Sequence, residues 1–256
     1  MRVRNQWTLA MALLLLASGC AKHEKKPPPP TPAPKAMKPA PPTPISIKKV
    51  ELGQDTWDHS WDRIIEEAIP ASMLSYRVPH DVRHFCPRFY TMDVADKRAF
   101  WAYFFQALAG AEAGLDPTTR VRHTEPEVAV KDSVTGRLVR SQGLLQLTYE
   151  DQRRYGCDFD WKVDRKLKPD NLDRTILRPK NNLECGVKIL EHQIIDRHRP
   201  LVTRTSYWST LHPGTSDYHM FARQMTNPPI ACGLHEKRAG KHAGRRRSAA
   251  RHVAMK

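Results

Sequence analysis

Several features that would fix a class of protein are scarce or missing in this sequence of 256 residues. Its longest apolar stretch, from Trp7 to Ala17, is about half of the ~20 apolar residues that a membrane-spanning helix needs. The sequence has no internal repeat, so no repeat architecture is expected. Its five cysteines are widely spaced and form no Cys-x-x-Cys pair, which argues against a zinc site. We therefore expect no membrane-spanning helix, no repeat fold and no metal.

Net charge is also missing from most of the chain, although the whole sequence has a net charge of +15. Residues 1–49 have a net charge of +8 and residues 235–256 have +7. Residues 50–234 hold 25 basic and 25 acidic residues, so this long segment is neutral overall. The C-terminal segment lacks apolar periodicity and predicts a disordered basic tail. A nucleic-acid-binding arm has the same composition. The export signal described next favours anionic polymers or lipids of a cell envelope, and no nucleic-acid partner is expected.

The first 20 residues have the pattern of an export signal. Arg2 and Arg4 precede the apolar stretch, and small residues follow it before Cys20. The run Leu16-Ala17-Ser18-Gly19-Cys20 resembles a bacterial lipobox, although Ala17 stands where leucine is usual. The resemblance implies cleavage before Cys20 and acylation of that residue. It therefore implies a membrane-anchored lipoprotein on the periplasmic side of a bacterial cell envelope. Ordinary secretion, with cleavage at another position, is the alternative.

A proline-rich segment separates this signal from the rest of the chain. Ten of the eighteen residues from Pro27 to Pro44 are proline, and such a stretch favours an extended, semi-rigid spacer. An SH3-type ligand has a similar composition but is not expected in an exported chain. We predict a signal peptide at 1–19, a lipidated Cys and Pro-rich linker at 20–49, one folded domain at 50–234 and a basic tail at 235–256.

Helical periodicity dominates the predicted domain. Residues 97–113 form the strongest helix, capped by Asp93 or Asp96 and ended by Gly114. Short strands at 128–130 and 138–139 flank a turn at 132–136 and predict a hairpin. The other helices are expected at 56–68, at 148–155 behind a Thr148–Asp151 capping box, at 181–198 behind Asn181, and from about Arg204 onward. The fold class is therefore mainly α (α+β), with a small β-hairpin.

Four cysteines remain if Cys20 is lipidated, and they allow three pairings. An exported chain meets an oxidising compartment, which favours disulfides. We predict a Cys157–Cys185 bond, because Cys157 follows one predicted helix and Cys185 lies in the first turn of another. The bond Cys86–Cys232 then follows by elimination.

Glu112 is the candidate catalytic residue. It follows Leu108 by four positions and Phe105 by seven, so it shares the apolar stripe of the strongest helix. Burial and the negative end of the helix dipole both disfavour the carboxylate, and both raise its pKa. A carboxylic acid that stays protonated near neutral pH is what general-acid cleavage of a glycosidic bond requires. The alternative is a glutamate at the exposed end of a helix.

Three motifs in order carry a family resemblance. The first is Ala109-Gly110-Ala111-Glu112-Ala113-Gly114-Leu115-Asp116-Pro117, the second is Ser141-Gln142-Gly143-Leu144-Leu145-Gln146-Leu147, and the third is Asn182-Leu183-Glu184-Cys185-Gly186. Together they resemble the soluble lytic transglycosylase family across roughly residues 85–210. In that family a helix ends in a catalytic glutamate, a Ser-x-Gly-Leu-Met-Gln motif lines the cleft, and a later Asn with Gly four residues on begins a packing helix.

The resemblance implies a lysozyme-like fold and cleavage of the MurNAc–GlcNAc bond of peptidoglycan without a cofactor. Glu112 is then the acid that also acts as the base, and the substrate's own N-acetyl group and 6-hydroxyl give a 1,6-anhydro product. The resemblance further implies that Ser141 and Gln146 line the cleft, and that Gly143 lets the backbone approach the glycan closely.

The sequence departs from the family pattern at three places. Ala113 replaces the usual serine, Leu145 replaces methionine, and no Ala-Tyr-Asn-Ala-Gly motif follows the Asn182 helix. Tyr207 either supplies the hydroxyl of the missing motif or is a core aromatic residue.

The reaction itself also has alternatives. A hydrolysing muramidase needs a second carboxylate, for which Glu125, Glu127 and Asp132 are candidates. A non-catalytic peptidoglycan-binding lipoprotein and a structural spacer between membrane and wall are the remaining alternatives.

Overall fold

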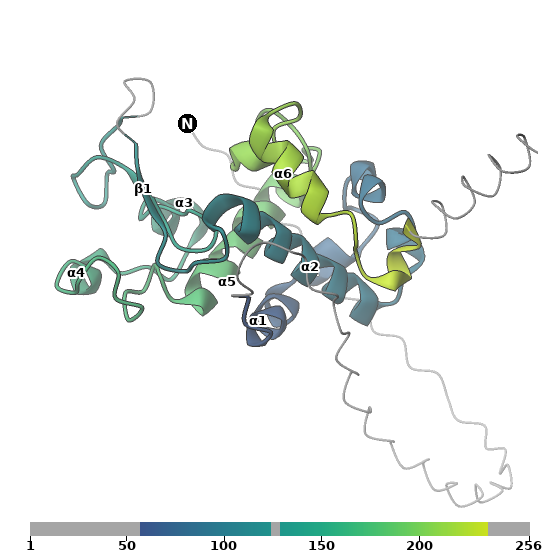
Figure 1. The fold of residues 1–256 in the computed structure, drawn as a ribbon, viewed down its shortest axis with the longest axis horizontal. Helices are drawn as coiled ribbons and strands as arrows, with labels where there is room; N and C mark the ends of the chain where they lie inside the picture. The colour runs from purple at the N-terminus through teal and green to yellow at the C-terminus, as the bar shows by residue number, and fades with distance from the viewer. Residues whose placement is uncertain (1–56, 124–128, 235–256) are drawn as a thin grey trace, which may run out of the picture. The chain divides into compact units, whose positions relative to one another are not determined.

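The computed structural model describes residues 57–123 and 129–234 (Figure 1). The signal segment, Cys20, the proline-rich linker, the strand residue Val128, and the basic tail at 235–256 all lie outside these residues. Within the two described ranges, no helix combines the length and the apolar character needed to cross a bilayer.

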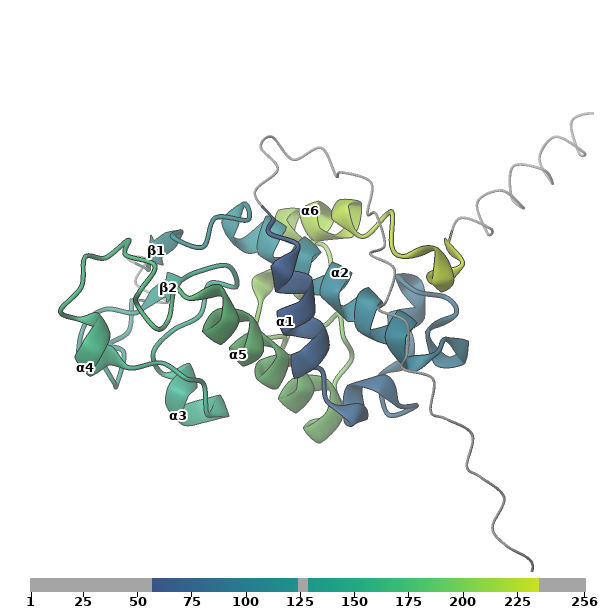
Figure 2. The same ribbon diagram turned by 90° about the horizontal axis from the view of Figure 1, so that it is seen from below.

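The helix α2 (Val94–Ala113) is the centre of the fold (Figure 2). Most of its residues are buried, including four consecutive aromatic or small residues from Trp101 to Phe104. Asp93 caps its start by accepting a hydrogen bond from the backbone N–H of Asp96 at 2.8 Å. Gly114 ends it in the left-handed conformation, with φ of 59°. The predicted helix is therefore confirmed, with Asp93 as the cap and a start three residues earlier than Lys97.

Three more helices pack around α2. The helices α1 (Ser60–Ala68) and α6 (Ser216–Gln224) both contact α2, and α1 also contacts α5 (Pro179–Glu191). Gly110 marks the closest approach of α6, because a Cβ at that position would lie 2.6 Å from Oε1 of Gln224. These contacts bury one hydrophobic core, which includes Ile65, Leu108 and Phe221.

A small antiparallel sheet follows α2. It pairs β1 (Arg120–Arg122) with β2 (Arg140–Gln142), in the register Arg120↔Gln142, Val121↔Ser141 and Arg122↔Arg140. Further along the hairpin, Lys131 pairs with Leu138 around a turn in which Oδ1 of Asp132 accepts two backbone hydrogen bonds at 2.8 Å. The predicted turn is therefore confirmed, and Val139 donates to the carbonyl of Val130 at 2.9 Å as the predicted hairpin requires, but the continuous strands lie further from the turn, at β1 and β2.

The remaining elements are short. Two single-turn α-helices, α3 (Asp151–Tyr155) and α4 (Trp161–Asp164), follow the hairpin, and the last turn of the α5 segment, at His192–Asp196, is π-helical. Tight 3₁₀ turns connect the larger helices, at Ala71–Leu74, His80–His84, Phe89–Thr91, Ser209–Leu211 and Ile230–Cys232.

Several predicted boundaries were wrong. Asn181 does not cap α5: the helix begins at Pro179, whose ring presets the helical φ, and the side chain of Asn181 instead donates to the carbonyl of Asp158 at 2.7 Å. The last helix does not begin near Arg204. It begins at Ser216, because Thr215 accepts a hydrogen bond from the N–H of Tyr218 at 3.1 Å.

Both predicted disulfides are confirmed. Cys157 is bonded to Cys185 and joins the end of the α3 region to α5, while Cys86 is bonded to Cys232 across 146 positions of sequence. The predicted fold class is also confirmed, since the described chain is mainly helical with one small hairpin.

Candidate active site

Glu112 lies in the last turn of α2, with its side chain partly buried beside the turn that carries Thr210. This burial is the main reason why its pKa is raised to about 7. Two neighbours modify that effect. The hydroxyl of Thr210 donates to Oε1 of the carboxylate and lowers the pKa, whereas the negative charge of Asp217 raises it. The carboxyl group therefore exchanges its proton near neutral pH, in the direction that the sequence predicted.

The two neighbours of Glu112 come from segments that the sequence did not assign to the site. Thr210 is buried in the turn Ser209–Leu211, and Asp217 lies in the first turn of α6. Both residues come after the last family motif in the sequence. No repeat or spacing in their local sequence indicates a contact with Glu112. The contact of α6 with the C-terminal half of α2 brings them there.

The second family motif forms a tight turn beside the start of the hairpin. Gly143 has a φ of +78° and its N–H donates to the carbonyl of Thr119 at 2.9 Å. Gln146 also has a positive φ, +50°, and its side-chain Nε2 donates to the carbonyl of Gly143 at 2.8 Å. Its Oε1 is buried and meets no hydrogen-bond donor in the described part of the chain. Gln146 therefore fixes the turn through its amide nitrogen and leaves an acceptor unused.

The third motif holds this turn in place. Asn182 accepts a hydrogen bond from the N–H of Leu145 at 2.9 Å and donates to the carbonyls of Gln142 and Ile176 at 3.2 and 2.9 Å. One helical turn later, a Cβ on Gly186 would lie 2.1 Å from Cδ1 of Leu145. The Asn and the Gly four residues on therefore form one packing face of α5, as the family resemblance implied.

The same contacts explain why residue 143 is a glycine, and the explanation differs from the predicted one. A Cβ at this position would lie 2.4 Å from Nδ2 of Asn182. The space that glycine leaves is therefore filled by Asn182, and the close approach of the protein backbone to the glycan at Gly143 remains a prediction.

Ser141 lies on β2 and its Oγ is 2.8 Å from Nε2 of His123. His123 was not singled out in the sequence, although the register of β1 and β2 places the residue after β1 beside this strand. The pair is partly exposed at the sheet.

Tyr207 does not supply a hydroxyl to Glu112. Its hydroxyl donates to Oδ2 of Asp151 at 2.6 Å, and burial raises the pKa of Tyr207 well above its ordinary value. Its neighbour Trp208 is a core residue whose Nε1 donates to the carbonyl of Leu145 at 2.9 Å. The core interpretation of Tyr207 therefore fits, and Thr210 is the residue whose hydroxyl reaches Glu112.

The acids proposed for a second carboxylate do not gather with Glu112 in the described chain. Asp132 is 2% exposed and binds the N–H groups of its own turn. Glu125 and Glu127 lie outside the described residues. In residues 57–123 and 129–234, no three His, Cys, Asp or Glu side chains cluster as a metal site would require.

Comparisons with known proteins support the fold. No protein-family model matches the chain, and no curated protein matches it. Among solved structures, the wild-type Bdellovibrio protein DslA, which has a lysozyme-like fold, superposes with a TM-score of 0.52 and 23% identity, covering 67% of this chain and 91% of that one. Two glutamate-to-glutamine variants of DslA superpose with TM-scores of 0.52 and 0.51 at 22% identity, with the same coverage. At this identity the likeness is one of fold: the described domain is lysozyme-like, and Glu112 lies in the last turn of its central helix.

Proposed function

We propose that this chain is a peptidoglycan lytic transglycosylase that cleaves the MurNAc–GlcNAc β-1,4 bond. One observation carries the proposal: in a lysozyme-like fold, the last turn of the central helix holds a shielded carboxyl group whose pKa is raised to about 7. Such a group can donate and recover a proton in one catalytic cycle at neutral pH.

In the proposed reaction, protonated Glu112 donates its proton to the glycosidic oxygen as the bond from that oxygen to C1 of the muramic acid breaks. The N-acetyl group of the same sugar stabilises the positive charge that develops at C1. The 6-hydroxyl then attacks C1, and the Glu112 carboxylate accepts the proton that this oxygen loses. One C–O bond breaks, another forms within the sugar, and Glu112 ends protonated, so no water and no cofactor are consumed.

Other residues near Glu112 and in the second family motif have supporting roles in this proposal. The Thr210 hydroxyl fixes the orientation of the Glu112 carboxyl group and is a positioning residue. Ser141 lines the glycan cleft, and Gln146 shapes the turn beside it through the hydrogen bond from its Nε2 to the carbonyl of Gly143. Tyr207 is left out, because its hydroxyl is bonded to Asp151.

A hydrolysing muramidase is the second candidate, and Asp217 favours it. Asp217 is a carboxylate whose charge raises the pKa of Glu112, so the two groups interact. Glycosidases that use water commonly employ two carboxylates, one as the acid and one as base or nucleophile.

The products of sacculus digestion test the proposal. Purified sacculi are incubated with residues 50–256 and the released muropeptides are examined by mass spectrometry. Anhydro-muramic ends support the transglycosylase, and reducing ends from the incorporation of water support the muramidase. Binding without products would replace both with a glycan-binding module, and neither binding nor products would leave a structural lipoprotein.

The proposed location rests on residues outside the described structure. We propose that Cys20 is lipidated and anchors the chain in a membrane at the periplasmic side of the envelope, with 20–49 as the spacer. Labelling cells with a fatty-acid analogue should mark the wild-type chain and leave a Cys20→Ala variant unlabelled and soluble. Label on the variant would overturn the anchor.

A further inference from the structure

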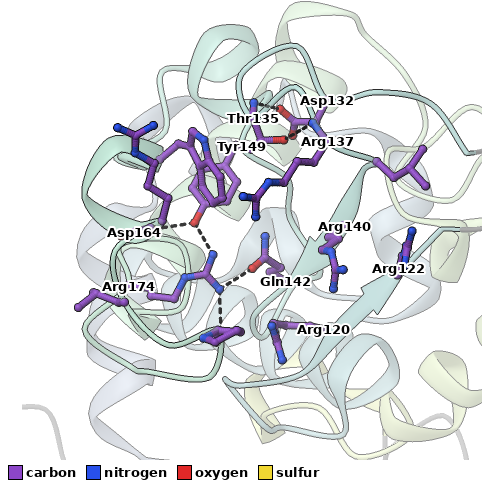
Figure 3. Close-up of a pocket in the computed structure, with 15 residues that line it drawn as sticks. Arg120, Arg122, Asp132, Thr135, Arg137, Arg140, Gln142, Tyr149, Asp164 and Arg174 are labelled. Carbon is purple, nitrogen blue, oxygen red and sulfur yellow. Dashed lines mark hydrogen bonds between the residues drawn. The ribbon is translucent and has the colours of Figure 1, made fainter.

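A basic pocket lies beside the β1–β2 hairpin, and Glu112 is not among the residues that line it (Figure 3). Its volume is about 510 Å³. Two of its lining residues are acidic, Asp132 and Asp164, and six are arginines: Arg120, Arg122, Arg137, Arg140, Arg165 and Arg174. A domain that is neutral overall therefore concentrates positive charge in one cavity.

The two acids offset only part of this charge, since six arginines face two carboxylates, and both carboxylates are held by hydrogen bonds within the fold. Oδ1 of Asp132 accepts the N–H groups of Val134 and Thr135. Asp164 accepts hydrogen bonds from Thr175, through both its N–H and its hydroxyl at 2.7 Å, and from the hydroxyl of Tyr149 at 2.8 Å. Neither carboxylate forms an ion pair with an arginine of the pocket, as far as the structure describes the chain.

The hairpin register brings like charges together. Arg122 lies directly opposite Arg140, and Arg120 lies two residues before Arg122, so all three share one face of the sheet. Like charges directly opposite each other destabilise a strand pair. Their backbones pair within the sheet, but the side chain of none of the three forms a hydrogen bond or ion pair with another residue in 57–123 or 129–234. Figure 3 shows their side chains on the two strands at one side of the pocket. The arrangement has a cost for folding and leaves three guanidinium groups available to an anion.

Arg174 is the fixed member of the pocket. It is 5% exposed, and it donates to Oε1 of Gln142 at 2.9 Å, to the hydroxyl of Tyr149 at 2.8 Å and to the carbonyl of Pro169 at 2.7 Å. Its Nε is buried and meets no acceptor among the described residues. Arg174 is therefore a fixed positive charge in the wall of the pocket, oriented by its three hydrogen bonds.

We propose that this pocket binds the carboxylates of the peptide branch that peptidoglycan carries on its muramic acid. The inference rests on the proposed function. Arginine forks suit carboxylates, while the apolar walls provided by Leu138, Trp161 and Leu167 suit the carbon chain of a peptide better than a bare phosphate.

The position of the pocket fits a branch of the same substrate. Eight residues lead from Glu112 to Arg120, so their Cα atoms lie within about 28 Å of each other. Strand β2 carries Arg140 and Gln142 on the side of the pocket and Ser141, the proposed cleft residue, on the opposite face. One short strand therefore serves both the glycan and its peptide.

The test compares two substrates and two double variants. The substrates are glycan strands with their peptides and the same strands after an amidase has removed the peptides. Arg122→Gln/Arg140→Gln should lower kcat/KM about tenfold on peptide-bearing strands and leave peptide-free strands unaffected. Arg77→Gln/Arg83→Gln removes two exposed arginines elsewhere and should change neither value. Equal losses on both substrates, or no loss on either, would overturn the proposal.

A binding measurement separates failure of the pocket from failure of the proposed function. Calorimetry with a soluble disaccharide–tetrapeptide should show binding to the wild type that weakens with salt and is lost in the pocket double variant, even if no glycan is cleaved. The peptide-free disaccharide and inorganic phosphate are the other two arms. If phosphate binds at the pocket and the peptide-bearing muropeptide does not, the ligand is a phosphate polymer and the peptide proposal falls.

Discussion

The hydroxyl of Thr210 donates a hydrogen bond to the carboxylate of Glu112, across 98 positions of sequence. This bond stabilises the charged form of Glu112, whereas burial and the charge of Asp217 stabilise the protonated form. The balance leaves the pKa at about 7. The proposed catalyst is therefore tuned by two residues from the last quarter of the chain.

Glu112→Gln should abolish glycan cleavage and preserve the fold. The amide has nearly the same volume but cannot donate and recover a proton. Activity is measured as muropeptides released from sacculi, and folding by circular dichroism. A variant that cleaves at the wild-type rate would remove Glu112 from the mechanism.

The same variant should change how stability depends on pH. A folded state that raises the pKa of an acid from 4.5 to about 7 binds the proton more tightly than the unfolded chain. The free energy of unfolding therefore falls by up to about 3 kcal/mol as pH rises through this window. Glu112→Gln lacks this loss, so its stability relative to wild type should be higher at pH 8 than at pH 4.5. An equal difference at both pH values would show that Glu112 is not shielded as described.

Thr210→Val and Asp217→Asn should shift the pH profile of cleavage in opposite directions. The active form has Glu112 protonated, so the rate falls as pH rises through its pKa. Thr210→Val removes a hydrogen bond that lowers the pKa of Glu112. The alkaline side of the pH–rate profile should therefore shift to higher pH, by about one pH unit. Asp217→Asn removes a charge that raises the pKa of Glu112, so the alkaline side of the profile should shift to lower pH.

Thr226→Val is the matched control for Thr210, because its hydroxyl donates to the carbonyl of Arg223 at the end of α6 and to no other group among the described residues. This control variant should leave the pH–rate profile of cleavage unchanged. Asp217 has a second outcome of interest: if Asp217→Asn instead abolishes cleavage, the two-carboxylate muramidase is favoured over the transglycosylase.

Gly143→Ala should destabilise the domain more than Gly136→Ala does. Both glycines have positive φ, +78° and +65°, so both alanine variants lose about 1 kcal/mol from backbone strain. At Gly136 nothing lies within 4 Å of the added Cβ, whereas at Gly143 the Cβ meets Nδ2 of Asn182 at 2.4 Å. The extra loss, on the order of 1–3 kcal/mol, isolates the packing of the turn against α5. Equal midpoints in urea unfolding would contradict this contact.

Local signals in the sequence predicted the centre of this fold. The apolar spacing of 97–113, the cap at Asp93 and the stop at Gly114 all concern neighbours within a few residues, and they located α2 and Glu112. The family resemblance of the Asn182–Gly186 motif also implied a packing helix, which the structure places against Leu145. Each of these signals depends on residues close in the chain.

The parts that were not predicted depend on long-range packing. Thr210 and Asp217 reach Glu112 because α6 packs on Gly110, and no local pattern records that contact. Similarly, β1 and β2 contain mostly arginine and polar residues, so alternation of apolar and polar residues did not mark them as strands. The basic pocket was not predicted for the same reason. The net charge of residues 50–234 is zero, and only the fold brings the six arginines of the pocket together.

Replacing Cys157 and Cys185 together by serine should lower the free energy of unfolding by about 3 kcal/mol. The bond closes a loop of 28 residues, and opening it restores entropy to the unfolded chain. Calorimetry under oxidising conditions measures the change, and mass spectrometry of non-reduced peptides checks the pairing. A wild-type sample with both thiols free, or with either paired to Cys86 or Cys232, would contradict it.

Removal of the basic tail should weaken binding to the envelope without affecting catalysis on short soluble glycans. Residues 235–256 lie outside the described structure and carry a net charge of +7, whereas 50–234 are neutral overall. The attraction of exposed charges is screened beyond a Debye length of ~8 Å at physiological ionic strength. A chain that ends at Leu234 should therefore bind sacculi or anionic vesicles more weakly than the full-length chain at low salt, and equally at high salt.

The basic pocket remains in the truncated chain, so any salt-sensitive binding that persists belongs to its arginines, and Arg122→Gln/Arg140→Gln in that background should remove it. If truncation instead destroys activity on short glycans, the tail is part of the folded domain and the boundary at Leu234 is wrong.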